Sequence, residues 1–318
     1  MSEEKLSWLE IAFRLEGSVA KTILPRIGIF TVFTALVCLW QYLEKEPKFI
    51  LHIGDLTNNV VYNLVLGLLL VFRTNTSYER FWDGRKSLGL LGVNLRNLAR
   101  FIRLSIAEEN AEERENKATI LKLLVAFMVA TKLQLRGEKP NKELKKLLNE
   151  KQALEIDSAN RISLQIALWI GEYLQQQLKL GKIDSSQRVE MNNMLNNMVE
   201  GLSSCERIST TPLPIAYRIY LKRLILIYCV GLPFNLIEKM QWWAIPVVAI
   251  VSFILLGLEE VGKELENPFL YGVNDLPVDA LCNNLIGDIE SIANFSSGEF
   301  LSLTPKESPF AVLSEKTE

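Results

Sequence analysis

The sequence has little of the chemistry that enzymes use in their active sites. Its 318 residues include one histidine, His52, which excludes histidine-rich metal sites and nearly every scheme in which histidine activates a serine or cysteine. No glycine-rich phosphate loop, HExxH motif or GxSxG motif occurs. The sequence therefore predicts a protein that is not an enzyme and that carries no metal or other cofactor.

Cysteine and net charge are also scarce. The four cysteines are far apart and form no CxxC pair, so they predict buried free thiols and neither a disulfide framework nor a zinc site. They are Cys38, Cys205, Cys229 and Cys282. The 35 basic and 37 acidic residues give a net charge of −2, which provides no basic footprint for nucleic acid.

Apolar residues, in contrast, gather in four runs that contain no charged side chain. Hydrophobic residues make up 49% of the chain, and the mean hydropathy is +0.15. The runs cover residues 27–43, 56–72, 224–237 and 240–258. A bilayer core of about 30 Å needs about 20 helical residues, so three of these runs predict membrane-spanning helices once flanking residues are added. The third run is shorter and contains Gly231 and Pro233; it predicts a span too, with a buried soluble helix as the alternative.

The joins between the runs predict two antiparallel hairpins. Residues 44–55 separate the first two runs, and only Glu238 and Lys239 separate the last two. Cationic residues flank the spans mainly on the side of the chain ends and the long middle region. The positive-inside rule therefore places both termini and residues 73–222 of this multi-pass protein in the cytoplasm. Interfacial aromatic residues then fall at the outer ends of the spans: Trp40, Tyr42, Trp242 and Trp243.

The segments outside the spans predict further helices. Residues 1–22 place Trp8, Ile11 and Leu15 on one helical face, which predicts a cytosolic amphipathic segment or an ordinary packed helix. Residues 73–222 show helical periodicity, and 123–130 are apolar all round, which predicts a helix buried by others. The hairpins occupy 23–72 and 223–258, a cytosolic C-terminal segment occupies 259–295, and the polar tail 296–318 is predicted to be flexible.

Two pairs of adjacent carboxylates, Glu108–Glu109 and Glu259–Glu260, are predicted to be solvated or salt-bridged surface groups. A helical membrane protein without a catalytic set is more typically a conduit, a carrier or a sensor. A secondary transporter is disfavoured because no ionisable side chain falls at the middle of a span.

Five short motifs carry a resemblance to a known family. RTNTSYERFWDGRK (73–86) follows the second run, CER (205–207) and TPLPIAY (211–217) precede the third, and ELENPF (264–269) and NDLPVDALC (274–282) follow the fourth. In this order they resemble the bestrophin family of ion channels on its prokaryotic side, over roughly residues 5–295. The resemblance implies an all-α membrane protein: four transmembrane helices in two hairpins plus a helical cytosolic domain, assembled as a homopentamer around a central pore.

The resemblance also implies where the pore is narrow. In the family the second membrane helix lines an apolar neck, and the matching positions here are Leu64, Leu68 and Phe72. Spacing of four keeps these side chains near one helix face, and packing against neighbouring helices is the alternative. A second constriction at the cytosolic exit falls near Ser186, where the family usually has an apolar residue. Ile183 is the candidate if the register shifts, and a solvated turn serine is the alternative for Ser186.

The family further suggests which ion passes, and a departure from the pattern of its animal members argues against bound calcium. Animal relatives bind Ca²⁺ through a dense acidic run after the Asn-Pro-Phe motif, but residues 270–275 here hold too few carboxylates for a calcium site. The family's commonest activity is passage of small anions, chiefly chloride and also bicarbonate or nitrate. Arg73 attracts anions if it faces the pore, or else pairs with a carboxylate or a lipid headgroup. Helix N-termini after Pro212 and Pro214 are further places where amide dipoles face anions.

The predicted partners are accordingly small inorganic ions, the lipid bilayer and further copies of the chain. Two other functions stay open from the sequence. One is a monovalent-cation channel on the same scaffold, because the neck positions carry no charge. The other is a membrane scaffold or sensor that transports nothing.

Overall fold

The computed structural model describes residues 10, 14, 17–43 and 51–295, and every regular element among them is helical. They divide into two compact units. The first contains the residues up to Ser87 together with Ser204–Pro277, and the second contains Leu88–Ser203 and the segment from Val278. The predicted N-terminal segment 1–22, apart from residues 10, 14 and 17–22, and the tail 296–318 lie outside the described residues.

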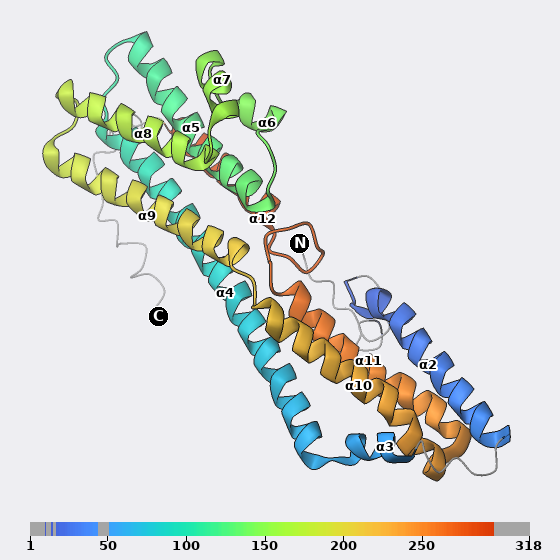
Figure 1. Ribbon diagram of the computed structural model, residues 1–318. Coiled ribbons are helices and arrows are strands. Elements are labelled where there is room, and N and C mark those ends of the chain that lie inside the picture. Colours follow the sequence, from blue (N-terminus) through green and yellow to red (C-terminus); the bar gives the residue numbers. More distant parts are fainter. Residues whose placement is uncertain (1–9, 11–13, 15–16, 44–50, 296–318) are drawn as a thin grey trace, which may run out of the picture. The chain divides into compact units, whose positions relative to one another are not determined.

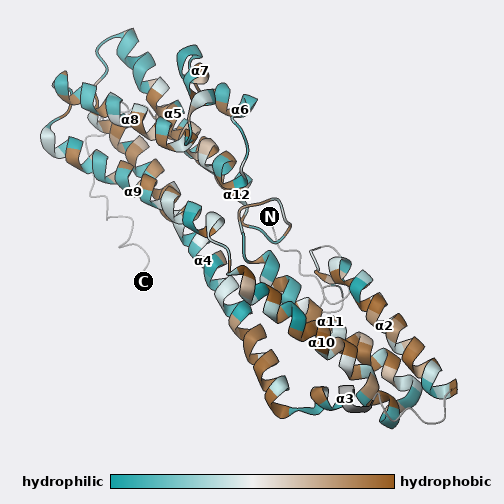
Figure 2. Ribbon diagram, in the orientation of Figure 1, coloured by the Kyte–Doolittle hydropathy of each residue, from teal (hydrophilic) through white to brown (hydrophobic). Residues whose placement is uncertain are grey.

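The first unit holds the helices that the apolar runs predicted. They are α2 (Ala20–Leu43), α3 (Leu51–Asn58), the first half of α4 (Val60–Ser105), α10 (Ile215–Met240), the short 3₁₀ helix η1 (Gln241–Trp243) and α11 (Ala244–Glu264). Three stretches of this unit are long and apolar enough to cross a membrane: α2, α4, and α10 together with α11. Figure 2 shows their apolar character as brown ribbon along α2, the start of α4, α10 and α11.

The second apolar run is not a single helix, which corrects the predicted span at 56–72. Residues up to Asn58 belong to α3, and α4 starts at Val60. Asn59 separates them because its side-chain oxygen accepts hydrogen bonds from the backbone N–H groups of Val61 and Tyr62, at 2.9 and 3.2 Å. A side chain that satisfies the free N–H groups of a first turn caps a helix. The polar cap ends one helix and starts the next within an apolar stretch.

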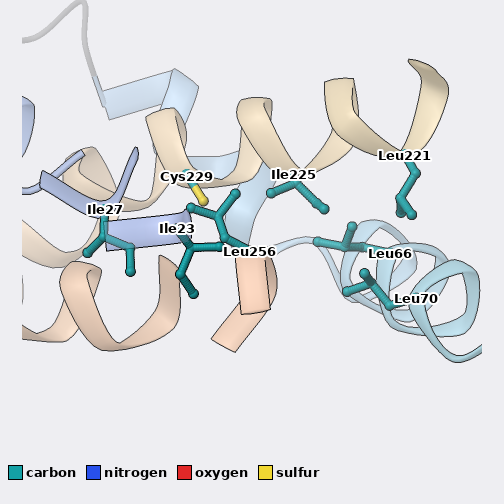
Figure 3. Close-up of a cluster of buried hydrophobic side chains, with 8 residues drawn as sticks. All are labelled: Ile23, Ile27, Leu66, Leu70, Leu221, Ile225, Cys229 and Leu256. Atoms are coloured by element: carbon teal, nitrogen blue, oxygen red, sulfur yellow. The ribbon is translucent and has the colours of Figure 1, made fainter. Parts of the chain in front are cut away.

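Helices α10 and α11 form the close hairpin that the sequence predicted, whereas the first pair opens around them. Helix α2 packs mainly on α11, and α3 packs on α10, where a Cβ on Gly54 would lie 2.9 Å from the backbone nitrogen of Asn235. Figure 1 draws α10 and α11 between α2 and α4. A common apolar cluster, drawn in Figure 3, joins the four helices. Its members are Ile23, Ile27, Leu66, Leu70, Leu221, Ile225, Cys229 and Leu256.

The predicted interfacial aromatic residues gather at one end of this unit. Trp40 and Tyr42 end α2, while Trp242 and Trp243 lie in η1, and all four side chains are exposed. The two places are adjacent, because the thiol of Cys38 lies 3.8 Å from the carbonyl oxygen of Gln241. This end therefore has the character of a membrane–water boundary.

The second unit is built around α5 (Ala111–Arg136). Its other elements are the rest of α4, α6 (Lys142–Lys145), α7 (Glu150–Ser158), α8 (Ile162–Lys179), most of α9 (Ser185–Thr210) and α12 (Val278–Ala293). Helix α5 is also apolar enough to span a membrane, but 78% of its most apolar window is buried, against 22–33% in the other three candidates. Since α8 and α12 pack on it, α5 is the core helix that residues 123–130 predicted.

Ion pairs hold the ends of this core together. Glu108 faces Arg103, Arg114 and Lys117, and the hydrogen bond from Lys117 lowers the pKa of the carboxyl group against the opposing effect of burial. Glu108 is thus salt-bridged, as predicted. The four cysteines of both units are buried and free, which confirms the prediction of structural thiols.

Candidate pore helix and its charged anchor

The first half of α4 has one face packed inside the subunit and another that is open. Leu66, Leu70 and Arg73 are buried. Because successive helical residues are separated by about 100°, Leu64 and Leu68 each point about 160° away from Leu66. The three predicted neck residues are indeed exposed: 66% of Leu64, 49% of Leu68 and 55% of Phe72. About half or more of each side chain is thus uncovered in the described subunit, and the stripe is free to face a pore, lipid or another chain.

Arg73 directly follows this stripe, and its side chain turns the other way. It is 1% exposed, and its guanidinium lies 3.4 Å from the Glu259 carboxylate on α11. Of the alternatives that the sequence left open, pairing with a carboxylate is therefore the one the structure contains. Arg73 does not present its charge at the surface of the described subunit, so the predicted ion-attracting role has no support from its position.

Glycine at position 262 makes room for this arginine. A Cβ at Gly262 would lie 3.1 Å from Nε and 3.3 Å from Cγ of Arg73. Such contacts are tighter than side chains ordinarily make. The Arg73 side chain therefore lies directly against α11 at Gly262, about one helical turn after its partner Glu259.

The acidic pair at the end of α11 is buried, so the prediction of surface carboxylates is wrong here. Glu259 and Glu260 are each 2% exposed. Arg26 lies 3.1 Å from Glu260 and 4.0 Å from Glu259, and Lys222 lies 3.9 Å from Glu259. Lys263 pairs with Glu260 from the next turn. Burial is tolerated because cations surround both carboxylates.

We call these six residues the charged anchor: Arg26, Arg73, Lys222, Glu259, Glu260 and Lys263. Four cations and two carboxylates leave it with a net charge of +2. The sequence held a signal for it, since every member flanks an apolar run on the same predicted side of the membrane. Ionisable side chains that lie at one level of a membrane-helix bundle commonly pair with one another.

Arg80, in the longest motif, has a structural role that sequence reasoning missed. Its guanidinium donates hydrogen bonds to the carbonyl oxygens of Ile208, Thr211 and Glu266. Three backbone acceptors from two separate segments are thereby held by one side chain of α4. No periodicity in the sequence indicates these partners.

The Asn-Pro-Phe motif also packs on α4. A Cβ on Gly84 would lie 3.0 Å from the ring of Phe269 and 3.2 Å from Pro268. Phe269 is fully buried, and the carbonyl of Pro268 accepts a hydrogen bond from the backbone of Leu276 at 2.8 Å. Several motifs that carry the family resemblance thus meet along one stretch of α4.

A carboxylate of the same chain lies at the start of α10. The backbone N–H of Leu213 donates to Glu266 Oε1 at 2.9 Å, and the Glu266 carboxylate is 5% exposed. The helix N-terminus after Pro214, one of the predicted anion-facing places, therefore has a carboxylate of its own chain beside it.

The two candidates for the cytosolic constriction have different surroundings in the second unit. Ile183 is 4% exposed and belongs to the core, so it does not line a passage in the described subunit. Ser186 is exposed in the first turn of α9. Asp184 fixes this turn, because its side chain accepts from the backbone N–H of Gln187 at 2.8 Å, while the Gln187 side chain accepts from the backbone N–H of Asp184 at 3.0 Å. Of the two, only Ser186 is exposed in the described subunit.

The loop after the Asn-Pro-Phe motif closes on itself. Asp275 accepts a hydrogen bond from the backbone of Gly272 at 2.7 Å, and Asn274 donates to the carbonyl of Gly17 and to Glu264. Across residues 10, 14, 17–43 and 51–295, no three histidine, cysteine or acidic side chains are grouped as metal ligands.

Comparison with known proteins identifies the family. A sequence profile described as "Bacterial/Fungal Bestrophin protein" matches residues 1–291. The chain belongs to the bestrophin family. This bestrophin is 46% identical to a voltage-dependent anion channel-forming protein of Nostoc sp., over 93% of its own length and 95% of that protein. It is 42% identical to a protein of the same description from Synechocystis sp., over 90% and 91% of the two chains.

Solved structures agree with this assignment. A bacterial bestrophin homologue from Klebsiella pneumoniae superposes with a TM-score of 0.76 at 27% identity, covering 86% of this chain and 99% of that one. The match confirms the resemblance and the predicted fold class, an all-helical membrane protein with four long apolar helices. The bestrophin is therefore a multi-pass membrane protein of a channel-forming family and not an enzyme.

The charged anchor predicts an asymmetry between its members. Glu259→Gln leaves Arg73 buried without the only carboxylate that the described residues pair with it, and removing one partner of a buried ion pair costs about 3–5 kcal/mol. Arg73→Met leaves Glu259 beside Arg26 and Lys222, so its effect is expected to be smaller. Thermal unfolding of the purified protein in detergent measures both, and Arg73→Met combined with Glu259→Met should recover stability relative to Glu259→Gln. Equal midpoints for the two single variants would contradict this account of the anchor.

Proposed function

We propose that this bestrophin is a pentameric channel that passes small anions, chloride first and bicarbonate or nitrate as further candidates, down their electrochemical gradient. The observation that carries the proposal is its 46% identity, over nearly the whole chain, to a voltage-dependent anion channel-forming protein. The exposed apolar stripe of α4 supports it, because a channel needs a face that the subunit itself leaves uncovered.

In the proposed assembly the neck is made by Leu64, Leu68 and Phe72 of each subunit. Five copies of the stripe form three apolar rings, which raise a dehydration barrier and gate by dewetting. Below the neck the path widens within the helical cytosolic part and leaves past a ring of Ser186. A polar ring at that point makes the exit wetter than an aliphatic one.

The preference for anions comes, in this proposal, from charge near the path and not from charge within the neck. The apolar rings carry no charge of either sign. The anchor contributes a net charge of +2 from each subunit at the inner ends of the spans. The start of α4, capped by Asn59, turns the positive end of its helix dipole toward the outer side. Both ends of the path then favour anions. The termini and residues 73–222 lie in the cytoplasm in this arrangement.

Reversal potentials test the proposed ion. The purified protein is reconstituted in a planar bilayer under a gradient of NaCl, and the measurement is repeated with sodium gluconate, whose anion is large. We expect the reversal potential to lie near that of chloride and the current carried by chloride to be lost with gluconate. A potential near that of sodium would identify the alternative, a cation channel. Absence of any flux from loaded liposomes would favour a scaffold or sensor.

Shortening the neck side chains tests the pore-lining face. Leu68→Ala and Phe72→Ala widen the proposed rings and remove apolar surface, so single-channel conductance is expected to rise in each variant. Matched controls are Leu36→Ala on α2 and Phe253→Ala on α11, which make the same changes on exposed faces of other spans. If the controls raise conductance as much as the α4 variants, the stripe does not line the pore.

The cytosolic exit is tested by Ser186→Ile. An aliphatic ring in place of the polar one should change the permeabilities of nitrate and bicarbonate relative to chloride, because a drier constriction makes the cost of dehydration count and that cost differs between these anions. Ser185→Ile is the control, since Ser185 is also exposed and points about 100° away from Ser186 on the helix. Altered permeability ratios in the control alone would place the exit one residue earlier.

A further inference from the structure

An elongated cavity of about 590 Å³ opens between α2, α10 and α11 of the first unit. Most of its lining is apolar and includes Phe30 and Phe33 of α2, Val230 of α10 and Leu256 of α11. The remaining lining residues are Arg26, Lys222 and Glu259, which all belong to the charged anchor. The cavity therefore has two chemically different parts, one apolar and one charged.

The two parts are arranged lengthwise along the spans. On α2, Arg26 comes seven residues before Phe33, and on α10, Lys222 comes eight residues before Val230. At a rise of about 1.5 Å per residue, the apolar part extends about 10–12 Å from the charged part. Helix α11 runs in the opposite sense, with Leu256 before Glu259, so its charge falls at the same end. The cavity is thus charged at one end, which we call its mouth, and apolar along the rest of its length.

The charge at the mouth is cationic and accessible. The Arg26 and Lys222 side chains are 42% and 55% exposed, whereas Glu259 is 2% exposed and also faces the buried Arg73. Glu259, the carboxylate among the lining residues, is thus shared with Arg73, which does not line the cavity, and Arg26 also donates a hydrogen bond to Glu260 behind the lining at 3.1 Å. A phosphate at the mouth is attracted by two exposed cations, and the anchor as a whole keeps a net charge of +2.

We infer that this cavity is a binding site for an anionic phospholipid, with the phosphate between Arg26 and Lys222 and an acyl chain along Phe30, Phe33 and Val230. Hydrocarbon surrounds the bundle, and basic residues at the end of a span attract anionic headgroups. A second copy of the chain fits less well, because it must supply an anionic group and an apolar segment joined in this order. The inference does not depend on ion conduction.

Native mass spectrometry of the detergent-purified assembly tests this site. The probes are phosphatidylglycerol and phosphatidylcholine with identical acyl chains. We expect the wild type to prefer phosphatidylglycerol. Lys222→Gln should weaken its binding about fivefold, since one basic residue near a membrane surface contributes about a factor of five. Arg223→Gln is the matched control: it makes the same charge change on the adjacent residue, which is exposed and does not line the cavity.

A second variant tests the apolar part without touching the charge. Val230 is half-buried in the wall, and Val230→Phe should reduce the retention of both lipids. Subunit number and unfolding midpoint, read on the same samples, confirm that each variant is folded.

Equal weakening by Lys222→Gln and Arg223→Gln would overturn the proposal, as would unchanged binding in both Lys222→Gln and Val230→Phe. Loss of subunits without loss of lipid would assign the cavity to a subunit contact and overturn it too. Displacement of the lipid by inorganic phosphate would show a phosphate site without an acyl-chain site.

Discussion

A buried ion pair between Arg73 and Glu259 ties α4 to α11. Together with the apolar cluster, the pair favours one side of α4 facing α11 and leaves the other side open. Leu66 and Leu70 lie on the same side as Arg73 and join the apolar cluster of the bundle, while Leu64 and Leu68 are left on the opposite side. The exposed stripe is thus a geometric consequence of where one arginine is held. Gly262 contributes by leaving space for that arginine on the surface of α11.

The residues that make the family recognisable serve mostly to hold the fold. Arg80 holds backbone carbonyls from the end of α9 and from the segment after α11. Gly84 receives the ring of Phe269. The Tyr217 hydroxyl donates to the carbonyl of Leu69 at 2.7 Å and so ties α10 to the neck helix. The proposed neck residues, in contrast, are exposed, which fits a division between residues that position α4 and residues that use its free face.

The sequence predicted the helices well and their buried charges poorly, for a physical reason. Apolar periodicity is local, so it revealed the spans, the α10–α11 hairpin and the buried core of α5. The break at Asn59 is also local, but a single capping side chain inside an apolar run gives a weak signal. The burial of Glu259 depends on Arg26 and Arg73, which lie on two other helices and more than 180 residues earlier in the chain. Periodicity does not report such partners. Ile183 and Ser186 are only three residues apart, and their different exposure depends on how the turn before α9 packs.

A buried ion pair is an unexpected choice for stability alone, because desolvation of two charges offsets much of their attraction. Its value here lies in specificity. Lipid chains are as apolar as leucine, so exchanging one apolar face of α4 for another changes the free energy little. Turning α4 by one residue would carry Arg73 away from Glu259, and breaking a buried ion pair costs about 3–5 kcal/mol. Since every 1.4 kcal/mol is a factor of ten, that penalty corresponds to a factor of more than about 100 in population. A neck built from uncharged rings cannot select its own orientation, so the buried charge on the other face of α4, together with the hydrogen bonds of Arg80 and Tyr217, sets it.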